Sequence, residues 1–118
     1  MKKKVLVYDN QLGYYEMLVR TIKKGYEFFL YKNKSDADEE YDAIAFFLHD
    51  EIEHLDMVRV YRPELPFVFA IGNKQDASLK TPDNVFIIDL DRTKGAIVKK
   101  FKDVFRQISL LVKKEEAL

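Results

Sequence analysis

YDAIAFFLHDEIEHLD, residues Tyr41–Asp56, is the stretch of this chain that decides its fold. Its apolar run extends from Ala43 to Leu48 and is followed at once by polar and charged residues that begin with His49. A short apolar run of this kind is typical of a strand that is covered on both faces, as in a parallel sheet. Open α/β sheets hold their functional sites at the carboxyl ends of such strands, so a site is expected around His49.

Other segments of the chain have the same strand character, being rich in β-branched and aromatic residues and bounded by polar ones. Together with Asp42–Leu48, the predicted strands are Lys2–Tyr8, Tyr26–Tyr31, Pro66–Gly72 and Val85–Ile88. Pro66 stands at a first strand position, where its missing hydrogen-bond donor is tolerated.

Helical periodicity alternates with these strands. Apolar residues recur every three or four positions from Leu12 to Ile22, with Asn10 expected to cap this helix and Gly25 to end it. The segments Lys32–Glu40 and Asn73–Asn84 offer few apolar residues, so helices there are expected to be short or absent.

Two further helices are predicted. The first is traced by the apolar residues Ile52, Leu55, Val58 and Tyr61 and stops before Pro63. The second, Thr93–Val112, has the strongest signal, and the tail Lys113–Leu118 is expected to fray. Its apolar face consists of Ile97, Phe101, Val104, Phe105, Ile108 and Leu111 or Val112.

Five strands that alternate with helices imply parallel pairing, right-handed crossovers and helices on both faces of the sheet. We therefore expect a doubly wound α/β fold in a single domain over residues 1–118. The 118 residues are 47% hydrophobic, which is enough for one core without disulfides or metals.

Composition excludes several classes of function. The chain has no cysteine, so it has no thiolate metal site and no thiol chemistry. Twenty basic residues offset twenty acidic ones, so no bulk charge favours nucleic acid or an anionic membrane as partner. The apolar stretch Val5–Val7 is too short for a signal peptide, and no run is long enough to span a bilayer. A cytoplasmic location without a bound cofactor is the expectation.

The order and lengths of the elements, with the phrases KVLVYDN, YDAIAFFL and LPFVFAIG and the final amphipathic helix, resemble the receiver domain of two-component response regulators. The resemblance covers nearly the whole chain. It implies a flavodoxin-like sheet with strand order 2-1-3-4-5, in a family that accepts a phosphoryl group on an aspartate after the third strand.

The resemblance also aligns the residues of the family's phosphorylation pocket with positions in this chain, and several of these positions hold a different type of residue. The pair of acids after the first strand becomes Asp9 and Asn10, and aligning Asp42 with the family motif puts Phe47 at the phospho-acceptor. The Thr or Ser after the fourth strand becomes Ile71 or Gly72, and the lysine after the fifth becomes Asp89.

Phosphoryl transfer needs a nucleophilic oxygen, a divalent cation and a positive charge on the phosphoryl oxygens. A phenyl ring at Phe47 supplies no nucleophile, and Asp89 repels phosphate. The resemblance therefore implies a degenerate receiver, or pseudo-receiver. We expect a non-enzymatic, phosphorylation-independent signalling module that binds a protein partner or forms a homodimer. The family's contact surface, formed by its fourth helix, fifth strand and fifth helix, maps to Phe86, Lys99, Lys102 and Arg106.

The acidic residues after the third strand leave alternatives open. Asp50 is either a helix-capping or loop acid or a displaced acceptor, although it lies roughly 10 Å beyond the expected place along an extended chain. The residues around it, His49, Asp50, Glu53, His54 and Asp56, are either a solvated helix start or a metal site.

Two further alternatives concern Asp9 and Asn10 and the function of the whole chain. Asp9 and Asn10 are either a relict metal corner or, as we favour, a strand end that caps a helix. A phosphorylatable, metal-binding or small-ligand-binding regulator that uses Asp9, His49, Asp50 and Glu53 is the alternative function.

Overall fold

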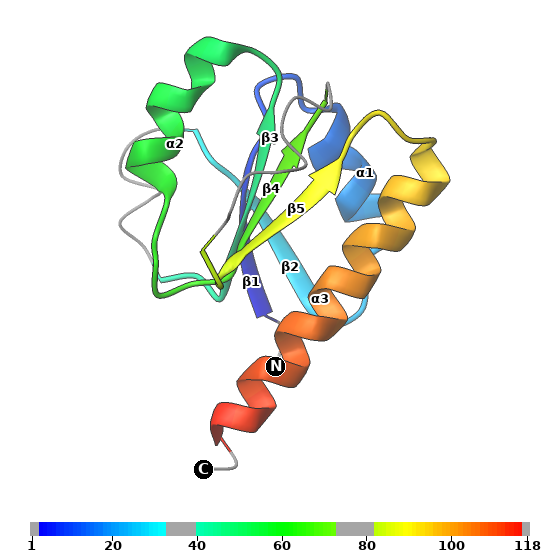
Figure 1. Ribbon diagram of the computed structural model, residues 1–118. Coiled ribbons are helices and arrows are strands. Elements are labelled where there is room, and N and C mark those ends of the chain that lie inside the picture. The colour runs from blue at the N-terminus through cyan, green and yellow to red at the C-terminus, as the bar shows by residue number, and fades with distance from the viewer. Residues whose placement is uncertain (1–2, 33–39, 73–81, 117–118) are drawn as a thin grey trace.

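A computed structural model describes residues 3–32, 40–72 and 82–116, with side chains of the last helix described up to Leu110 (Figure 1). Its five strands are all parallel and lie in the order β2-β1-β3-β4-β5, which confirms the predicted sheet. The strands are β1 (Lys3–Tyr8), β2 (Tyr26–Leu30), β3 (Ala43–Leu48), β4 (Phe67–Ile71) and β5 (Val85–Asp89).

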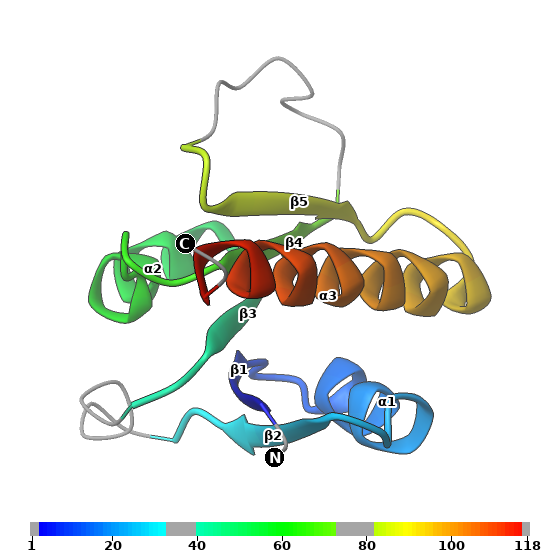
Figure 2. The same cartoon turned by 90° about the horizontal axis from the view of Figure 1, so that it is seen from below.

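The helices lie on both faces of this sheet (Figure 2). The helices α1 (Gly13–Thr21) and α3 (Lys94–Glu116) cover one face. The 3-10 turn η2 (Glu51–Glu53) and the helix α2 (His54–Val60) lie against the other. The described residues thus contain three α-helices, fewer than the doubly wound pattern implied. The expected short helices within Lys32–Glu40 and Asn73–Asn84 fall largely on 33–39 and 73–81, outside the described residues.

Side-chain alternation along the strands divides the interior into two clusters. Phe47 packs with the apolar faces of α1 and α3, whereas its neighbour Phe46 packs on the α2 side with Tyr8 and Val60. Both rings are fully buried. Because all strands run the same way, the residues that follow them gather at one edge of the sheet, where the candidate site lies.

The start and end of α1 differ from the sequence prediction. Its N-cap is Leu12, in a left-handed conformation with φ 65°, and Asn10 makes no cap bond to the helix. The helix ends at Thr21, before Gly25, which has φ 85° and leads directly into β2. Asn10 and Gly25 were therefore assigned the wrong roles, because both form part of turns rather than helix ends.

The helix α3 confirms the predicted apolar face, since Ile97, Phe101, Val104, Phe105 and Ile108 are all buried. It begins at Lys94 and continues to Glu116, so the expectation of a frayed tail is wrong for residues 113–116. Lysine and glutamate favour helical backbone, which accounts for the extension. The side chains of Leu111 and Val112 lie outside the described residues.

The helix α2 forms after β3 as predicted, but three of the apolar residues that traced it, Ile52 in η2 and Leu55 and Val58 in α2, face away from the sheet. Ile52, Leu55 and Val58 are 69%, 70% and 77% exposed. The residues turned inward are Glu53, Asp56, Met57 and Val60. Within the described ranges, no helix combines the length and apolarity that a bilayer crossing requires.

Candidate functional site

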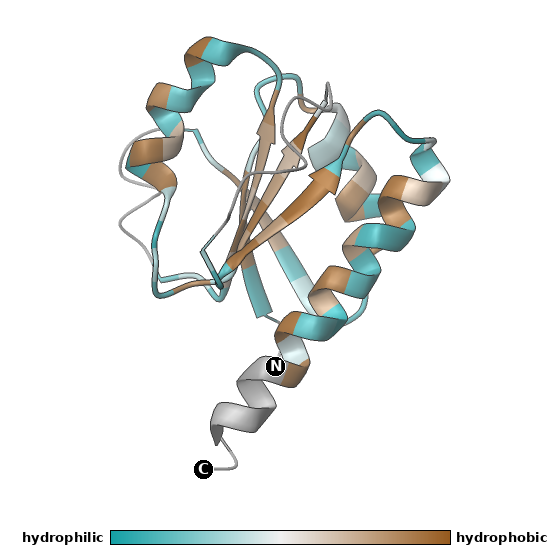
Figure 3. Ribbon diagram, viewed as in Figure 1, coloured by the Kyte–Doolittle hydropathy of each residue, from teal (hydrophilic) through white to brown (hydrophobic). Residues whose placement is uncertain are grey.

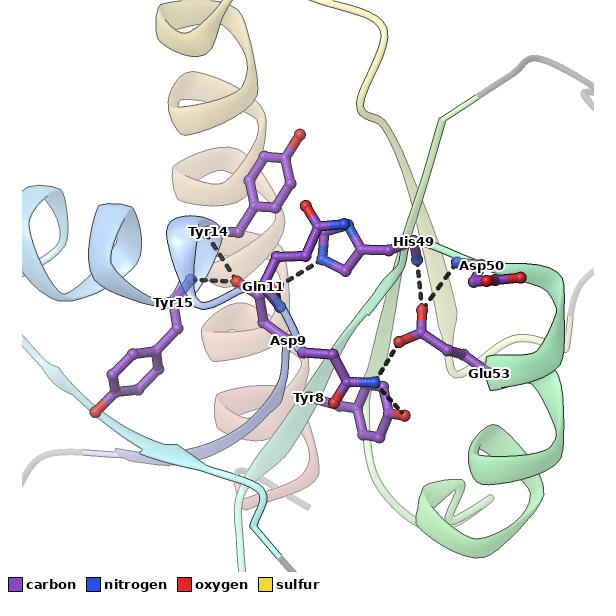
Figure 4. Close-up of polar contacts among 9 residues, drawn as sticks. Tyr8, Asp9, Gln11, Tyr14, Tyr15, His49, Asp50 and Glu53 are labelled. Carbon is purple, nitrogen blue, oxygen red and sulfur yellow. Dashed lines mark hydrogen bonds and ion pairs between the residues drawn. The ribbon is translucent and has the colours of Figure 1, made fainter.

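The carboxyl edge of the sheet holds a group of polar side chains contributed by β1, β3 and η2 (Figure 4). Its centre is Asp9, which directly follows β1 and is only 3% exposed. One carboxylate oxygen accepts hydrogen bonds from the backbone N–H groups of Tyr14, at 2.8 Å, and Tyr15, at 2.9 Å. Asp9 thus binds the first turn of α1, as expected of a strand end that caps a helix, and neutral amide dipoles stabilise its charge.

His49 contacts the other carboxylate oxygen of Asp9. Its Nε2 atom lies 2.5 Å from Oδ1, and the same oxygen accepts the backbone N–H of Gln11 at 3.1 Å. The Asp9 carboxylate therefore has four donors around it, all from this chain.

Glu53 is the second buried carboxylate of the group and is 5% exposed. Its Oε1 atom accepts the backbone N–H of His49 at 2.6 Å and of Asp50 at 3.0 Å, and its Oε2 atom accepts from the amide of Asn10. Asp50 accepts in return from the N–H of Ile52, which completes a capping box with Glu53. The interpretation of Asp50 as a helix-capping acid is confirmed.

Tyr8 joins β1 to α2. Its hydroxyl donates to Asp56 at 2.5 Å and accepts from the amide of Asn10 at 3.0 Å. Burial raises the pKa of Tyr8 well above its ordinary value, and the hydrogen bond to the Asp56 carboxylate raises that pKa further. The hydroxyl is therefore neutral and remains a donor at every physiological pH.

Phe47, the position aligned with the phospho-acceptor, is a core residue. It is fully buried, and its ring stacks on Tyr14 with centroids 4.8 Å apart and planes at 5°. Tyr14 also stacks on the ring of His49 at 5.7 Å, and Phe101 packs against Phe47 at 5.4 Å. Four rings, from α1, α3, β3 and the residue that follows β3, are thus in contact in series, in the order Phe101, Phe47, Tyr14 and His49.

The remaining pocket positions lie at the same edge but make other contacts. Ile71 and Asp89 are paired in register at the ends of β4 and β5. Asp89 lies 3.4 Å from Arg92 and accepts the N–H of Asp91 at 2.8 Å. A Cβ atom added to Gly72 would lie 3.4 Å from the Asp91 carboxylate. The structure therefore brings Asp9, Asn10, His49, Asp50 and Glu53 together, whereas Ile71, Gly72 and Asp89 form a separate acidic corner.

The geometry is poor for a metal ion. Each carboxylate of the group is turned toward its own set of N–H or O–H donors. Among the described residues, no three His, Asp or Glu side chains are arranged to hold an ion. Mg²⁺ needs several oxygen ligands in near-octahedral geometry, and binding it here would first break hydrogen bonds to Asp9 or Glu53.

A hollow of about 370 Å³ lies beside the group, between the start of α1 and the loop before α3. Tyr14, Gln11, Leu90 and Arg92 contribute to its lining. It is wide and shallow, and the buried carboxylates Asp9 and Glu53 do not line it.

The expected contact surface is split between two environments. Phe86 is half-buried and packs against the core cluster under α3. Lys102 and Arg106 border a hollow of about 470 Å³ together with Lys23 and Lys24 of the α1–β2 turn. Lys99 is exposed. Arg106 also lies 3.9 Å from Asp103 on its own helix.

Sequence reasoning missed Tyr8 and Tyr14, which no motif marks, whereas Asp56 was one of the candidate residues after the third strand. One signal was present for Glu53, because Asp50 and Glu53 have the three-residue spacing of a capping box. The period of two along β3 also places Phe47 and His49 on one face, although it does not reveal Asp9 as the partner of His49.

No family model matches this sequence, and no curated protein matches it. Solved structures match the fold at 14% identity. One, described as adenylate cyclase from Rhodopirellula baltica, has a TM-score of 0.63 over 99% of this chain and 97% of that one. NtrX from Brucella abortus, in complex with ATP, has a TM-score of 0.62 over 100% of this chain, which spans only 30% of NtrX. A response regulator receiver protein from Sinorhizobium medicae has a TM-score of 0.57, and the match covers 91% of this chain and 97% of that one. The receiver-like fold is thereby supported.

Proposed function

We propose that this chain is a signalling module of the response-regulator receiver type that acts through protein contacts, without phosphorylation at the carboxyl edge of its sheet. The receiver-like fold supports the first part of this proposal. One observation carries the second part. Phe47, at the position aligned with the phospho-acceptor, is fully buried against Tyr14 and offers no nucleophile.

The surroundings of Phe47 support the same conclusion. A phospho-acceptor site needs a bound cation and a positive side chain that neutralise the phosphoryl oxygens. Asp9 is instead saturated by three backbone N–H groups and His49. Asp89 adds negative charge where the family has a lysine, and Arg92 pairs with it. Among the residues that the structure describes at this edge, Arg92 is the cation beside Asp89, and it is paired with that carboxylate rather than held for an incoming phosphate.

The module is proposed to be non-enzymatic. The adenylate cyclase description and the bound ATP belong to the similar structures and suggest nucleotide chemistry as a rival function. Such chemistry depends on carboxylates that are free to hold Mg²⁺ against the phosphates. The buried carboxylates here, Asp9 and Glu53, are each engaged by donors of the chain itself.

The partner is proposed to be a protein, in the cytoplasm, with no nucleic acid or membrane involved. The surface of β5 and α3, with Lys99, Lys102 and Arg106, is the contact site that the resemblance implies. The basic hollow shared with Lys23 and Lys24 fits an acidic partner surface. Reversing the charge of Lys102 and Arg106 would weaken binding of such a partner and leave folding unchanged.

The test is an amide NMR titration with Mg²⁺ and beryllofluoride, a mimic of the phosphoryl group. The N–H groups of Gln11, Tyr14 and Tyr15 bond the Asp9 carboxylate, so a cation on Asp9 must shift their signals. We expect no saturable shift at these amides or at Phe47. Saturable shifts there would overturn phosphorylation independence.

The alternative, a metal or ligand site built from Asp9, His49, Asp50 and Glu53, is tested separately. Calorimetric titration with Mg²⁺, Mn²⁺ and Zn²⁺ should give no saturable heat. A heat that disappears in the matched variant His49→Ala would establish this alternative, because the His49 side chain joins the end of β3 to Asp9.

A further inference from the structure

The inner side of the segment formed by η2 and α2 carries two carboxylates beside the apolar residues Met57 and Val60, and its outer side carries exposed apolar residues. Glu53 and Asp56, on the inner side, are held by side chains and backbone groups of β1 and β3. Four hydrogen bonds, from Tyr8, Asn10, His49 and Asp50, fix this side against the sheet. The orientation of α2 is thus set by specific polar contacts, and turning the helix over would leave buried acceptors without donors.

The outward side carries three large exposed apolar residues spaced three apart, Ile52 of η2 and Leu55 and Val58 of α2. Figure 3 shows apolar and polar residues alternating along this helix. Each exposes more than two thirds of its surface. Isolated exposed apolar residues are ordinary, but residues at this spacing form one continuous stripe along a helix. We refer to these three residues as the α2 stripe.

Charged residues of opposite sign lie at the two ends of the α2 stripe. Glu51 precedes it and Arg59 follows it, and both are exposed. Each lies four residues from Leu55, on the same side of the helix as the stripe.

This arrangement is complementary to itself. If two α2 helices pack antiparallel about a two-fold axis through Leu55, Ile52 of one copy faces Val58 of the other. The same axis places Glu51 opposite Arg59 of the second copy, at both ends of the contact. A two-fold interface requires such a pairing of each residue with its symmetry counterpart. Parallel packing would instead set like charges against each other.

We propose that a second copy of this chain covers the α2 stripe, in an antiparallel α2–α2 homodimer. The charge pairing favours this occupant over an anionic membrane, which the exposed acids Asp50 and Glu51 would repel. The contact is distinct from the β5–α3 surface considered above. It rests on the proposed function only in that both treat the domain as an interaction module.

The expected association is weak. Contacts between two short helical segments bury less than the roughly 1,200 Å² of a standard interface, so the dimer is transient and depends on concentration. Dissociation constants between about 10 µM and about 1 mM correspond to such contacts.

Sedimentation equilibrium over this concentration range is the direct test. We expect the wild-type chain to dimerise and Leu55→Asp to remain monomeric. The substitution would bring two like-charged carboxylates, one from each copy, together at the two-fold axis of the dimer. Val19→Asp is the matched control, because Val19 is also an exposed apolar helix residue, in α1, and should leave the dimer intact. Circular dichroism of each variant verifies that the fold is retained.

Charge reversal tests the antiparallel geometry. Glu51→Arg and Arg59→Glu should each raise the dissociation constant about tenfold, because each creates two like-charge contacts per dimer. The double variant Glu51→Arg/Arg59→Glu should return it to within about twofold of wild type.

Three results would overturn the inference: a wild-type chain that stays monomeric at every concentration, a dimer that survives Leu55→Asp, and a double charge reversal that fails to restore dimerisation. A dimer lost in Arg106→Glu and kept in Leu55→Asp would assign it to the β5–α3 surface. The titration of Asp9 and Phe47 with Mg²⁺ and beryllofluoride is read out independently, so either proposal can fail while the other stands.

Discussion

The Nε2 atom of His49 lies 2.5 Å from Oδ1 of Asp9, forty residues away in the chain, and both side chains are almost entirely shielded from solvent. This contact joins the ends of β1 and β3. Where the family has a pair of acids after the first strand, this chain keeps Asp9, whose carboxylate is engaged by His49. The stability and the chemistry of this edge of the sheet both depend on it.

Asp9→Ala should be among the most destabilising polar substitutions in the chain. It removes the acceptor for three backbone N–H groups and for His49, so we expect the free energy of unfolding to fall by about 2–4 kcal/mol. Urea unfolding measures the change. Asp89→Ala is the control, since Asp89 is partly exposed and pairs with an exposed arginine, and should cost less than about 1 kcal/mol. Equal losses in the two variants would contradict the role assigned to Asp9.

Phe47→Asp should prevent folding and should not create a metal site. The substitution removes a fully buried ring and places a carboxylate among Tyr14 and Phe101. Loss of the ring alone, as in Phe47→Ala, is expected to cost about 3–5 kcal/mol, and burial of an unpaired charge adds to that loss. Phe47→Leu, which keeps most of the volume, should cost less than about 1.5 kcal/mol. A folded Phe47→Asp variant that binds Mg²⁺ would show that this position lies in an open pocket.

Tyr8 should make stability fall with pH in the alkaline range. Its pKa is raised in the folded state, so the folded chain holds the hydroxyl proton more tightly than the unfolded chain does. The stabilisation is complete below the unfolded pKa of about 10 and is lost as the pH rises above it. Thermal unfolding of wild type and Tyr8→Phe between about pH 8 and about pH 11 should show a shallower decline in the variant. Parallel profiles would contradict a folded-state shift at Tyr8.

Glu53→Ala should loosen α2 without disturbing the rest of the fold. The variant leaves the N–H groups of His49 and Asp50 without their acceptor and removes one of the two acceptors of the Asn10 amide, at an expected cost of about 2–3 kcal/mol. Hydrogen exchange should accelerate in η2 and α2 and stay unchanged in α3. Glu16→Ala, at an exposed position of α1, is the control and should change stability by less than about 0.5 kcal/mol. Uniform acceleration across the chain would mean that Glu53 stabilises the whole domain rather than α2.

Much of the fold could be predicted because its signals are local. An apolar run such as Ala43–Leu48 is typical of a strand whose two faces are both covered by helices. The alternation of such strands with helices in turn favours parallel pairing. The predicted strands and the long final helix are present, with their bounds shifted by a few residues at most for the strands. The strand order came from the family resemblance and is confirmed.

The candidate site was less predictable, because its contacts join residues that are far apart in the chain. Asn10 looked like a helix cap, but its side chain bonds Tyr8 and Glu53 instead, and Leu12 occupies the N-cap. Asn and Asp both suit such turns, so composition alone could not decide which of Asp9 and Asn10 would bind α1.

By itself the sequence determined the alternation of strands and helices, the residues of the core and the absence of an acidic side chain at Phe47. Only the tertiary structure decided that His49 would bind Asp9 and that α2 would turn Ile52, Leu55 and Val58 to solvent. The reason is that periodicity shows that a helix has an apolar side but not what that side will face. Here Tyr8, Asn10 and the end of β3 provide donors for Glu53 and Asp56, and satisfying those buried carboxylates orients the helix.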